Sequence, residues 1–170
     1  VGHGPLSHTT EEVMPMLHEL NLEIYSERSK NKKLRATHED YTMKYLTDSP
    51  LSDILKKNFS DISPFHIACL IDKSLVPKDD FFSDKGMDFR PLLSQLVSGE
   101  LDCDRMDYLE RDSYYTGTNY GKFDRDWMIA NLIPYQMENK YYLAINRRAL
   151  YTFDDFLISR HHIHLMVYFH

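Results

Sequence analysis

Helix-start signals recur along this sequence and constrain its fold more than any other feature. Ser49-Pro50 and Ser63-Pro64 each place a capping residue before a proline, which suits the first turn of a helix. Thr37 and Asp40 form a capping box, and residues 9–12 offer a further helix start. Apolar residues follow each start at helical spacing. The sequence therefore predicts a mainly helical protein.

One segment departs from this helical pattern. Residues 133–136 and 141–145 are rich in isoleucine and tyrosine, and they flank a polar turn at 137–140, which predicts a small β-hairpin. The charged segment 76–88 contains proline and glycine and is predicted to be a loop. We therefore expect an all-α fold with a small β-hairpin, in a single domain over residues 1–170.

Composition narrows the class of protein. Apolar residues make up 42% of the chain and charged residues 27%, which is typical of soluble globular proteins. No apolar stretch approaches the ~20 residues that span a bilayer. The net charge of -6 argues weakly against a general nucleic-acid binder, which usually presents a basic face. Cys69 and Cys103 form no CxxC motif, so we expect a cytoplasmic protein without a disulfide framework.

The first eight residues contain two histidines and two glycines. Glycines let the backbone approach a ligand closely, and histidines bind metal, donate to phosphate or exchange protons near neutral pH. A polar turn before a helix explains the same residues equally well. The run resembles the GHGPFSH element of HD-domain metal-dependent phosphohydrolases. This resemblance implies that His3 and His8 face substrate phosphates and take part in catalysis, with Glu11 as the acidic partner of His8.

A second histidine position follows from the same resemblance. The family carries a His-Glu pair at the distance where this sequence has His38 and Glu39, which implies that His38 belongs to the active site. Without that resemblance, a lone histidine at a helix start is more often a surface or capping group.

In that family a paired His-Asp and a further metal-binding histidine precede the GHGPFSH element. These residues would lie before Val1, and the sequence reaches His170 without a helix-stop signal. We therefore expect a partial HD domain that lacks its N-terminal metal-binding helices and its C-terminal continuation. With one of four metal ligands present, the 170-residue chain is expected to be inactive by itself, although its parent is an enzyme.

The segment from Gly99 to Asp112 carries a run of acidic residues. A solvated helix face is the usual explanation of such a run. At helical spacing, however, one face carries Asp104, Tyr108, Arg111 and Asp112, while apolar residues point elsewhere. A carboxylate on that face suits a hard or borderline cation, and arginine neutralises charge that develops on phosphate. The helix is therefore suited to phosphate chemistry.

The same segment resembles the form GxxDxDRxDYLxRD of HD-domain phosphohydrolases. The resemblance implies that Asp104 is the final metal-binding aspartate and that Arg105 contacts phosphate. It also implies that Tyr108 and Asp112 hold a deoxyribose, with the aspartate binding the 3′-hydroxyl. Residues 114–124 continue the resemblance downstream.

A last helix is predicted to open with Thr152 and to run to the end of the sequence. Arg160, His164 and Tyr168 recur on it at four-residue spacing and form one stripe. A plain surface stripe explains this spacing as well. In the nucleotide-hydrolysing branch of the family, a similar helix supplies an arginine to phosphate and a tyrosine beside the sugar and base. The resemblance therefore implies that these three residues bind substrate.

The branch that the sequence most resembles hydrolyses deoxynucleoside triphosphates to deoxynucleoside and triphosphate. The resemblance implies a divalent metal (Mn, Mg, Fe or Zn) whose bound water attacks the α-phosphorus. It also implies a dNTP substrate, a nucleotide activator and a homo-oligomer. Two alternatives stay open. One is an HD phosphohydrolase that acts on nucleoside monophosphates or cyclic nucleotides, and the other is a non-catalytic regulatory module that binds nucleotides.

Overall fold

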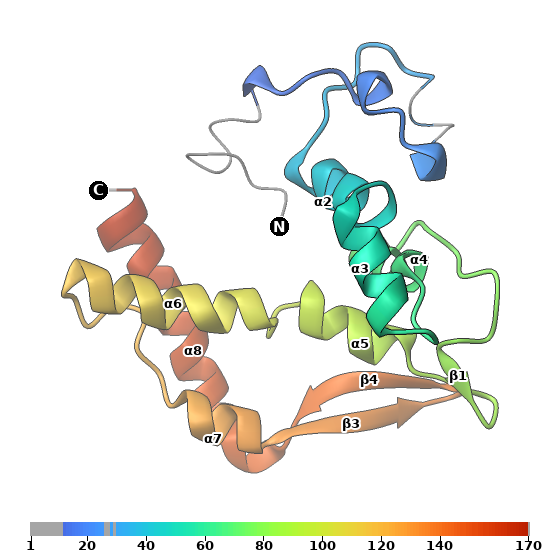
Figure 1. Cartoon of the computed structure of the whole chain (residues 1–170). Coiled ribbons are helices and arrows are strands. Elements are labelled where there is room, and N and C mark those ends of the chain that lie inside the picture. The colour runs from blue at the N-terminus through green and yellow to red at the C-terminus, as the bar shows by residue number, and fades with distance from the viewer. Residues whose placement is uncertain (1–11, 26–27, 29, 170) are drawn as a thin grey trace. The chain divides into compact units, whose positions relative to one another are not determined.

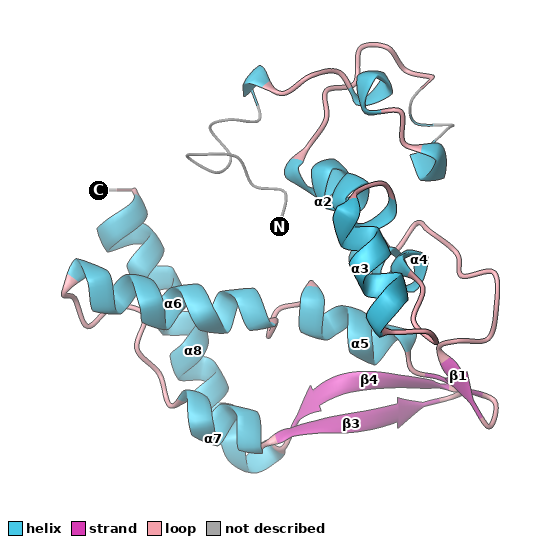
Figure 2. Cartoon of the chain, viewed as in Figure 1, coloured by secondary structure: helices cyan, strands magenta, loops and turns pink. Residues whose placement is uncertain are grey.

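The computed structural model describes residues 12–25, 28 and 30–169. The chain divides into two compact units, Val1–Asp79 and Asp80–His170, each with an apolar core of its own. Figure 1 follows the chain through both units, and Figure 2 distinguishes their helices from their strands. Within the described residues, no helix is both long enough and apolar enough to cross a membrane.

The described part of the N-terminal unit contains three α-helices, and each begins where the sequence predicts. They are α2 (His38–Thr47), α3 (Pro50–Asn58) and α4 (Pro64–Ile71). The hydroxyls of Ser49 and Ser63 each accept the backbone N–H two residues further on, at 3.1 Å. Thr37 and Asp40 form the predicted capping box, in which the carboxylate accepts the N–H of Thr37 at 2.9 Å. The three caps are confirmed.

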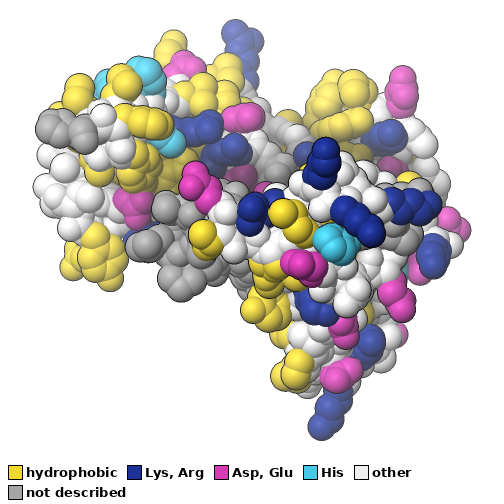
Figure 3. Space-filling model, turned by 90° about the horizontal axis from the view of Figure 1, so that it is seen from above, with side chains coloured by type: hydrophobic (Ala, Val, Ile, Leu, Met, Phe, Trp, Pro, Cys, Tyr) yellow, Lys and Arg dark blue, Asp and Glu magenta, His cyan; other side chains and the backbone are white. Residues whose placement is uncertain are grey.

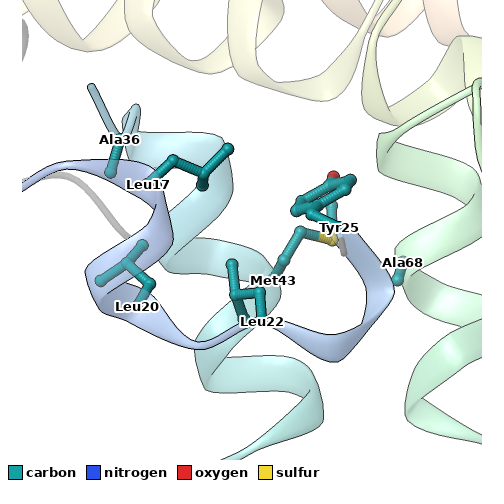
Figure 4. Packing of buried hydrophobic residues seen from close by; sticks show 7 residues of the cluster. All are labelled: Leu17, Leu20, Leu22, Tyr25, Ala36, Met43 and Ala68. Atoms are coloured by element: carbon teal, nitrogen blue, oxygen red, sulfur yellow. The ribbon is translucent and has the colours of Figure 1, made fainter. Parts of the chain in front are cut away.

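The core of this unit consists of side chains from the turns before α2 and from α2 and α4. Figure 4 shows the buried residues that form it: Leu17, Leu20, Leu22, Tyr25, Ala36, Met43 and Ala68. The hydroxyl of Tyr25 donates to Asp72 at 2.5 Å, and the guanidinium of Arg28 lies 4.4 Å from the centre of the Tyr25 ring. These contacts join the segment before α2 to the end of α4.

The helix start at residues 9–12 predicts a helix that runs through Met14, Leu17 and Leu20, and this prediction is wrong. Met14 is not helical, Leu17 and Leu20 lie in a short 3₁₀ turn, η2 (Leu17–Leu20), and a second such turn follows, η3 (Glu23–Tyr25). Pro15 has no N–H to donate and disfavours a helical conformation at the residue before it. Met16 is extended and forms an isolated β-bridge with Arg35 instead.

The C-terminal unit contains a four-stranded sheet with the order β1-β2-β4-β3. Its strands are β1 (Ser83–Asp84), β2 (Met87–Asp88), β3 (Leu132–Met137) and β4 (Lys140–Ile145). The long strands form the predicted hairpin, whose antiparallel register pairs Leu132 with Ile145. β2 joins β4 in parallel, and the N–H of Asp88 donates to the carbonyl of Asn139 at 2.8 Å.

The prediction of an all-α fold with a small hairpin is therefore wrong. Helices make up 56% of the structure, and the hairpin belongs to a mixed four-stranded sheet, so the fold is mixed α/β. The segment 76–88, predicted to be a loop, supplies β1 and β2. Two-residue strands are too short to show the alternating pattern that identifies a strand, and β2 pairs with a distant part of the chain.

The helices of this unit, in chain order, are α5 (Arg90–Val97), α6 (Cys103–Thr116), α7 (Arg125–Ala130), the 3₁₀ turn η4 (Arg147–Ala149), α8 (Leu150–Ile163) and the π-helical η5 (His164–Tyr168). α8 begins slightly before the predicted Thr152. In Figure 1, α6 lies across α8. Their contact buries Leu109, Phe156 and Ile163 completely, and this packing fixes the two helices that carry the candidate site.

Gly121 lets the loop after α6 close against both helices. Its φ is +92°, a conformation that favours glycine. A Cβ atom at this position would lie 2.7 Å from the carbonyl oxygen of Leu109 and 2.9 Å from Cδ1 of Ile163. Only glycine fits this approach without a shift of the backbone.

Candidate functional site

Two segments that the sequence analysis assigns to substrate binding meet in the C-terminal unit. Tyr108 lies on α6, and the centre of its ring is 6.5 Å from that of His164 and 6.4 Å from that of Tyr168. The rings of His164 and Tyr168 meet edge to face at 5.0 Å. The three rings therefore form one partly exposed cluster where residues of α6 and η5 meet.

The local shape of η5 contributes to this cluster. The N–H of Phe169 donates to the carbonyl of His164 at 3.0 Å, an i→i+5 bond that closes a π-helical turn. Such turns are rare and are frequent at functional sites. In this turn the rings of His164 and Tyr168 lie edge to face, and both are next to the ring of Tyr108.

Asp112 completes the cluster from the next turn of α6. The hydroxyl of Tyr168 donates to Oδ2 of Asp112, and Arg111 contacts Oδ1 of the same carboxylate at 3.2 Å. Burial, followed by the hydrogen bond and the negative charge of Asp112, raises the pKa of Tyr168. The phenol of Tyr168 therefore remains a hydrogen-bond donor at neutral pH.

The surroundings of His164 favour its neutral form. Burial lowers its pKa, and the positive charges of Arg160 and His161 lower it further. A neutral imidazole has one donor nitrogen and one acceptor nitrogen, so His164 suits a neutral hydrogen-bonding partner better than it suits a phosphate.

The two arginines predicted to contact phosphate are both paired with carboxylates. Nη1 of Arg105 lies 2.9 Å from Oδ2 of Asp102, which is buried and caps α6. Nη1 of Arg160 lies 3.2 Å from Oε2 of Glu100, across a separation of 60 residues. Both carboxylates belong to the turn that precedes α6.

Sequence reasoning missed Glu100 and Asp102 as parts of this site. The cap at Asp102 was open to detection, because an aspartate three residues before a helical Arg105 is a common N-cap pattern. The pair formed by Glu100 and Arg160 leaves no local signal, since its partners are distant in sequence.

Asp104 is exposed on the first turn of α6 and is the metal ligand implied by the resemblance. Among the residues that the structure describes, no group of three His, Cys, Asp or Glu side chains is placed to hold a metal ion. The described residues can therefore supply one metal ligand, Asp104, but they do not form a complete metal site.

The remaining predicted residues belong to the N-terminal unit. His38 lies in the N-terminal unit at the start of α2, where its Nε2 is 3.1 Å from Oε1 of Glu39. His3, His8 and Glu11 lie outside the described residues. Their predicted catalytic roles remain predictions.

On the face drawn in Figure 3, Lys and Arg side chains are interspersed with Asp and Glu side chains, rather than gathered into one basic surface. On α6 itself, Arg111 is paired with Asp107 at 3.1 Å as well as with Asp112. A polyanion that approaches α6 therefore meets arginines already paired with carboxylates, and a cation would favour its binding.

The sequence is similar to proteins that are themselves uncharacterized. No family model matches the sequence. An uncharacterized protein from Mycoplasma pneumoniae is 33% identical over 171 positions, which cover 99% of this chain and 34% of that protein. The uncharacterized protein YwfO from Bacillus subtilis is 29% identical over 171 positions, covering 100% of this chain and 31% of that protein.

A solved structure shows a similar fold. The crystal structure of a hypothetical protein from Aquifex aeolicus matches with a TM-score of 0.64 and 32% identity, covering 99% of this chain and 37% of that one. The chain thus spans about a third of the length of the relatives it matches. The activity, substrates and partners of the whole protein are therefore proposals.

Proposed function

We propose that the chain carries the sugar- and phosphate-binding face of an HD-type, metal-dependent deoxynucleoside triphosphate triphosphohydrolase. One observation carries this proposal: Tyr108 and Asp112 of α6 meet Tyr168 of η5, although the last two are 56 residues apart in sequence. The sequence resemblance assigns deoxynucleoside binding to each of these two segments separately. Their meeting in one cluster is what a single substrate site requires.

The chemistry of the cluster supports a deoxynucleoside. The side chain of Asp112 carries oxygens that accept a hydrogen bond from a sugar hydroxyl. Tyr108 and Tyr168 offer ring surface for a sugar or base, and the hydroxyl of Tyr168 holds the carboxylate in place. The neutral His164 adds a donor or an acceptor beside them.

The arginines supply the phosphate side of the proposed site. Arg105 and Arg160 both carry planar guanidinium groups, which bind phosphate through two parallel hydrogen bonds. A resident divalent metal would polarise the phosphate and supply the nucleophile. Asp104 would contribute one carboxylate to it, and the other ligands would come from outside the described residues.

Three further properties belong to the same proposal. The two cysteines are thiols, which is typical of a reducing compartment, so we propose a cytoplasmic location. A homo-oligomer and a nucleotide activator are proposed from the resemblance alone.

The test uses the whole protein encoded by the reading frame that contains this chain. It is incubated with Mn²⁺ or Mg²⁺ and each dNTP, alone and in pairs, and the phosphate product is identified by ion chromatography. We expect triphosphate release that is lost in Asp104→Ala, because the metal ligand is removed. Asp107→Ala is the matched control, since Asp107 is an exposed carboxylate of the same helix.

The other outcomes contradict the proposal in different ways. Orthophosphate released from monophosphates, with dNTPs left intact, would move the protein to another HD branch. Nucleotide binding without any product would support a regulatory module. Triphosphate release that survives Asp104→Ala would remove this aspartate from the metal centre.

A further inference from the structure

Glu100 lies in the turn between α5 and α6 and contacts an arginine of α8. Its Oε2 atom is 3.2 Å from Nη1 of Arg160. The side chain of Glu100 is 73% exposed and that of Arg160 is 31% exposed. Arg160 precedes His164 by one helical turn, so the pair adjoins the cluster of Tyr108, His164 and Tyr168.

From this geometry we propose that Glu100 forms an ion pair with Arg160 when no polyphosphate is bound. By competing for Arg160, it lowers the affinity of the site for phosphate-bearing ligands. The inference rests on the proposed function, because it takes Arg160 to be a phosphate ligand. Its ligand class is the polyphosphate group of a nucleotide. Glu100 is a positioning residue, since it acts through Arg160.

A phosphate group can readily replace Glu100 as the partner of Arg160. The ion pair joins one nitrogen of the guanidinium to one carboxylate oxygen. A guanidinium has five N–H donors and binds phosphate with two parallel hydrogen bonds. An exposed pair of this kind contributes little to stability, because water screens it. A polyphosphate therefore displaces Glu100 with a net gain.

The neighbouring carboxylate, Asp102, has a different role. It is buried, and it accepts the N–H groups of Gly99 at 3.2 Å and of Arg105 at 2.8 Å, as well as the Arg105 side chain. These bonds commit it to capping α6. Asp102 therefore holds the turn, whereas Glu100 extends from that turn toward Arg160.

Packing also fixes the position from which Glu100 extends. A Cβ atom added to Gly99 would lie 2.5 Å from the carbonyl oxygen of Gln95, so the turn lies directly against the end of α5. Once displaced, the Glu100 carboxylate remains beside the bound phosphates, because its backbone stays in place. Its negative charge then repels them, which adds to the competition for Arg160.

The test measures binding by the whole protein, at fixed Mg²⁺, with two probes in separate titrations. Inorganic triphosphate reports the phosphate side, and an uncharged deoxynucleoside reports the sugar side. We expect Glu100→Gln to bind triphosphate about two- to fivefold more tightly, the effect of removing one exposed ion pair. Binding of the deoxynucleoside is expected to stay unchanged.

Three further variants make the test specific. Glu110→Gln breaks an ion pair between Glu110 of α6 and Arg125 of α7 and is expected to leave both affinities unchanged. Glu100→Asp retains the charge and is expected to bind triphosphate much as the unmodified protein does. Arg160→Gln is expected to weaken triphosphate binding.

The outcomes separate this inference from the function on which it rests. If Arg160→Gln weakens binding while Glu100→Gln leaves it unchanged or weakens it, competition by Glu100 is wrong and Arg160 still binds phosphate. If Arg160→Gln binds triphosphate as tightly as the unmodified protein, the phosphate-binding role of Arg160 in the proposed function fails. An equal gain in deoxynucleoside affinity in Glu100→Gln would indicate a general structural change and overturn the competition.

Discussion

The chemical behaviour of a residue in this site depends on its neighbours more than on its residue type. His164 shows this most clearly. Burial removes water from its imidazole and lowers its pKa. The nearby charges of Arg160 and His161 lower this pKa further. A histidine with the same sequence spacing on an open helix would titrate near the ordinary value of 6.5. Its role as a neutral hydrogen-bonding group therefore depends on the fold.

The contribution of Arg160 is open to direct measurement. In Arg160→Gln the positive charge beside His164 is lost, so the imidazolium becomes easier to form and the pKa of His164 is expected to rise. The C2-proton chemical shift of His164, followed by NMR across the acid range, gives the midpoint. Arg125→Gln removes an arginine that pairs with Glu110 and Asp126 instead, and it should leave that midpoint unchanged. Equal shifts in both variants would mean that net charge, and not the neighbour, controls the titration.

At the scale of elements, the loop between α6 and α7 depends on one glycine. Gly121 and Gly117 both have positive φ, but a Cβ on Gly117 meets nothing within 4 Å, whereas one on Gly121 meets the backbone of α6. We expect Gly117→Ala to cost about 1 kcal/mol of unfolding free energy from backbone strain. Gly121→Ala should cost about 3 kcal/mol or more, because a steric conflict with a packed helix is added.

Urea unfolding followed by the fluorescence of Trp127 measures both substitutions. This residue, the chain's one tryptophan, lies on α7 in the same unit. Gly117→Ala is the matched control, since it carries the strain of a left-handed alanine without the steric conflict. Equal losses of stability in the two variants would show that the loop relaxes away from Leu109 and Ile163.

How far the sequence predicts each element depends on how local its cause is. Ser49 and Ser63 cap helices through hydroxyls that reach two residues along the chain, so these starts were predictable. β2 pairs locally with β1, but it joins the long hairpin because Asp88 pairs with Lys140, and no local sequence pattern predicts that second pairing. α7 was missed for a related reason, since six residues between Arg125 and Ala130 are too few to show helical periodicity.

The candidate site divides in the same way. The positions of Tyr108, Asp112 and Tyr168 on helical segments followed from spacing and resemblance, and the structure brings the three together. The ion pair of Glu100 and Arg160 depends on how α8 packs against α6, which spacing along either helix does not contain. The residues that surround a site are therefore harder to predict than the residues that form it.

At the scale of the whole molecule, each of the two units has its own buried core. The C-terminal unit also contains Trp127, whose fluorescence reports its unfolding. The N-terminal unit contains the hydrogen bond from Tyr25 to Asp72. Burial and the nearby carboxylate raise the pKa of Tyr25. Burial opposes the ionisation of Asp72, but hydrogen bonds from Tyr25 and Ser74 outweigh it and lower the pKa of Asp72.

The pH range over which this bond stabilises the fold follows from the two shifts. A raised pKa contributes stability that is present below the ordinary tyrosine value of 10.0 and is lost as the pH rises above it. A lowered pKa contributes stability that is present above the ordinary aspartate value of 3.8 and is lost as the pH falls below it. The bond is therefore fully effective between these two values.

Substitution of Tyr25 by Phe tests both this window and the independence of the two units. We expect Tyr25→Phe to lower the unfolding free energy by about 1 kcal/mol at pH 7, and by less at pH 3 and at pH 11. The exposed Tyr45→Phe is the control and should change nothing. Because the cores are separate, the loss should be seen in far-ultraviolet circular dichroism, which reports both units, and not in the fluorescence of Trp127. Equal shifts of both signals would show that the molecule unfolds as one cooperative unit. A loss of unfolding free energy that is constant with pH would show that the ring of Tyr25, and not its hydroxyl, supplies the stability.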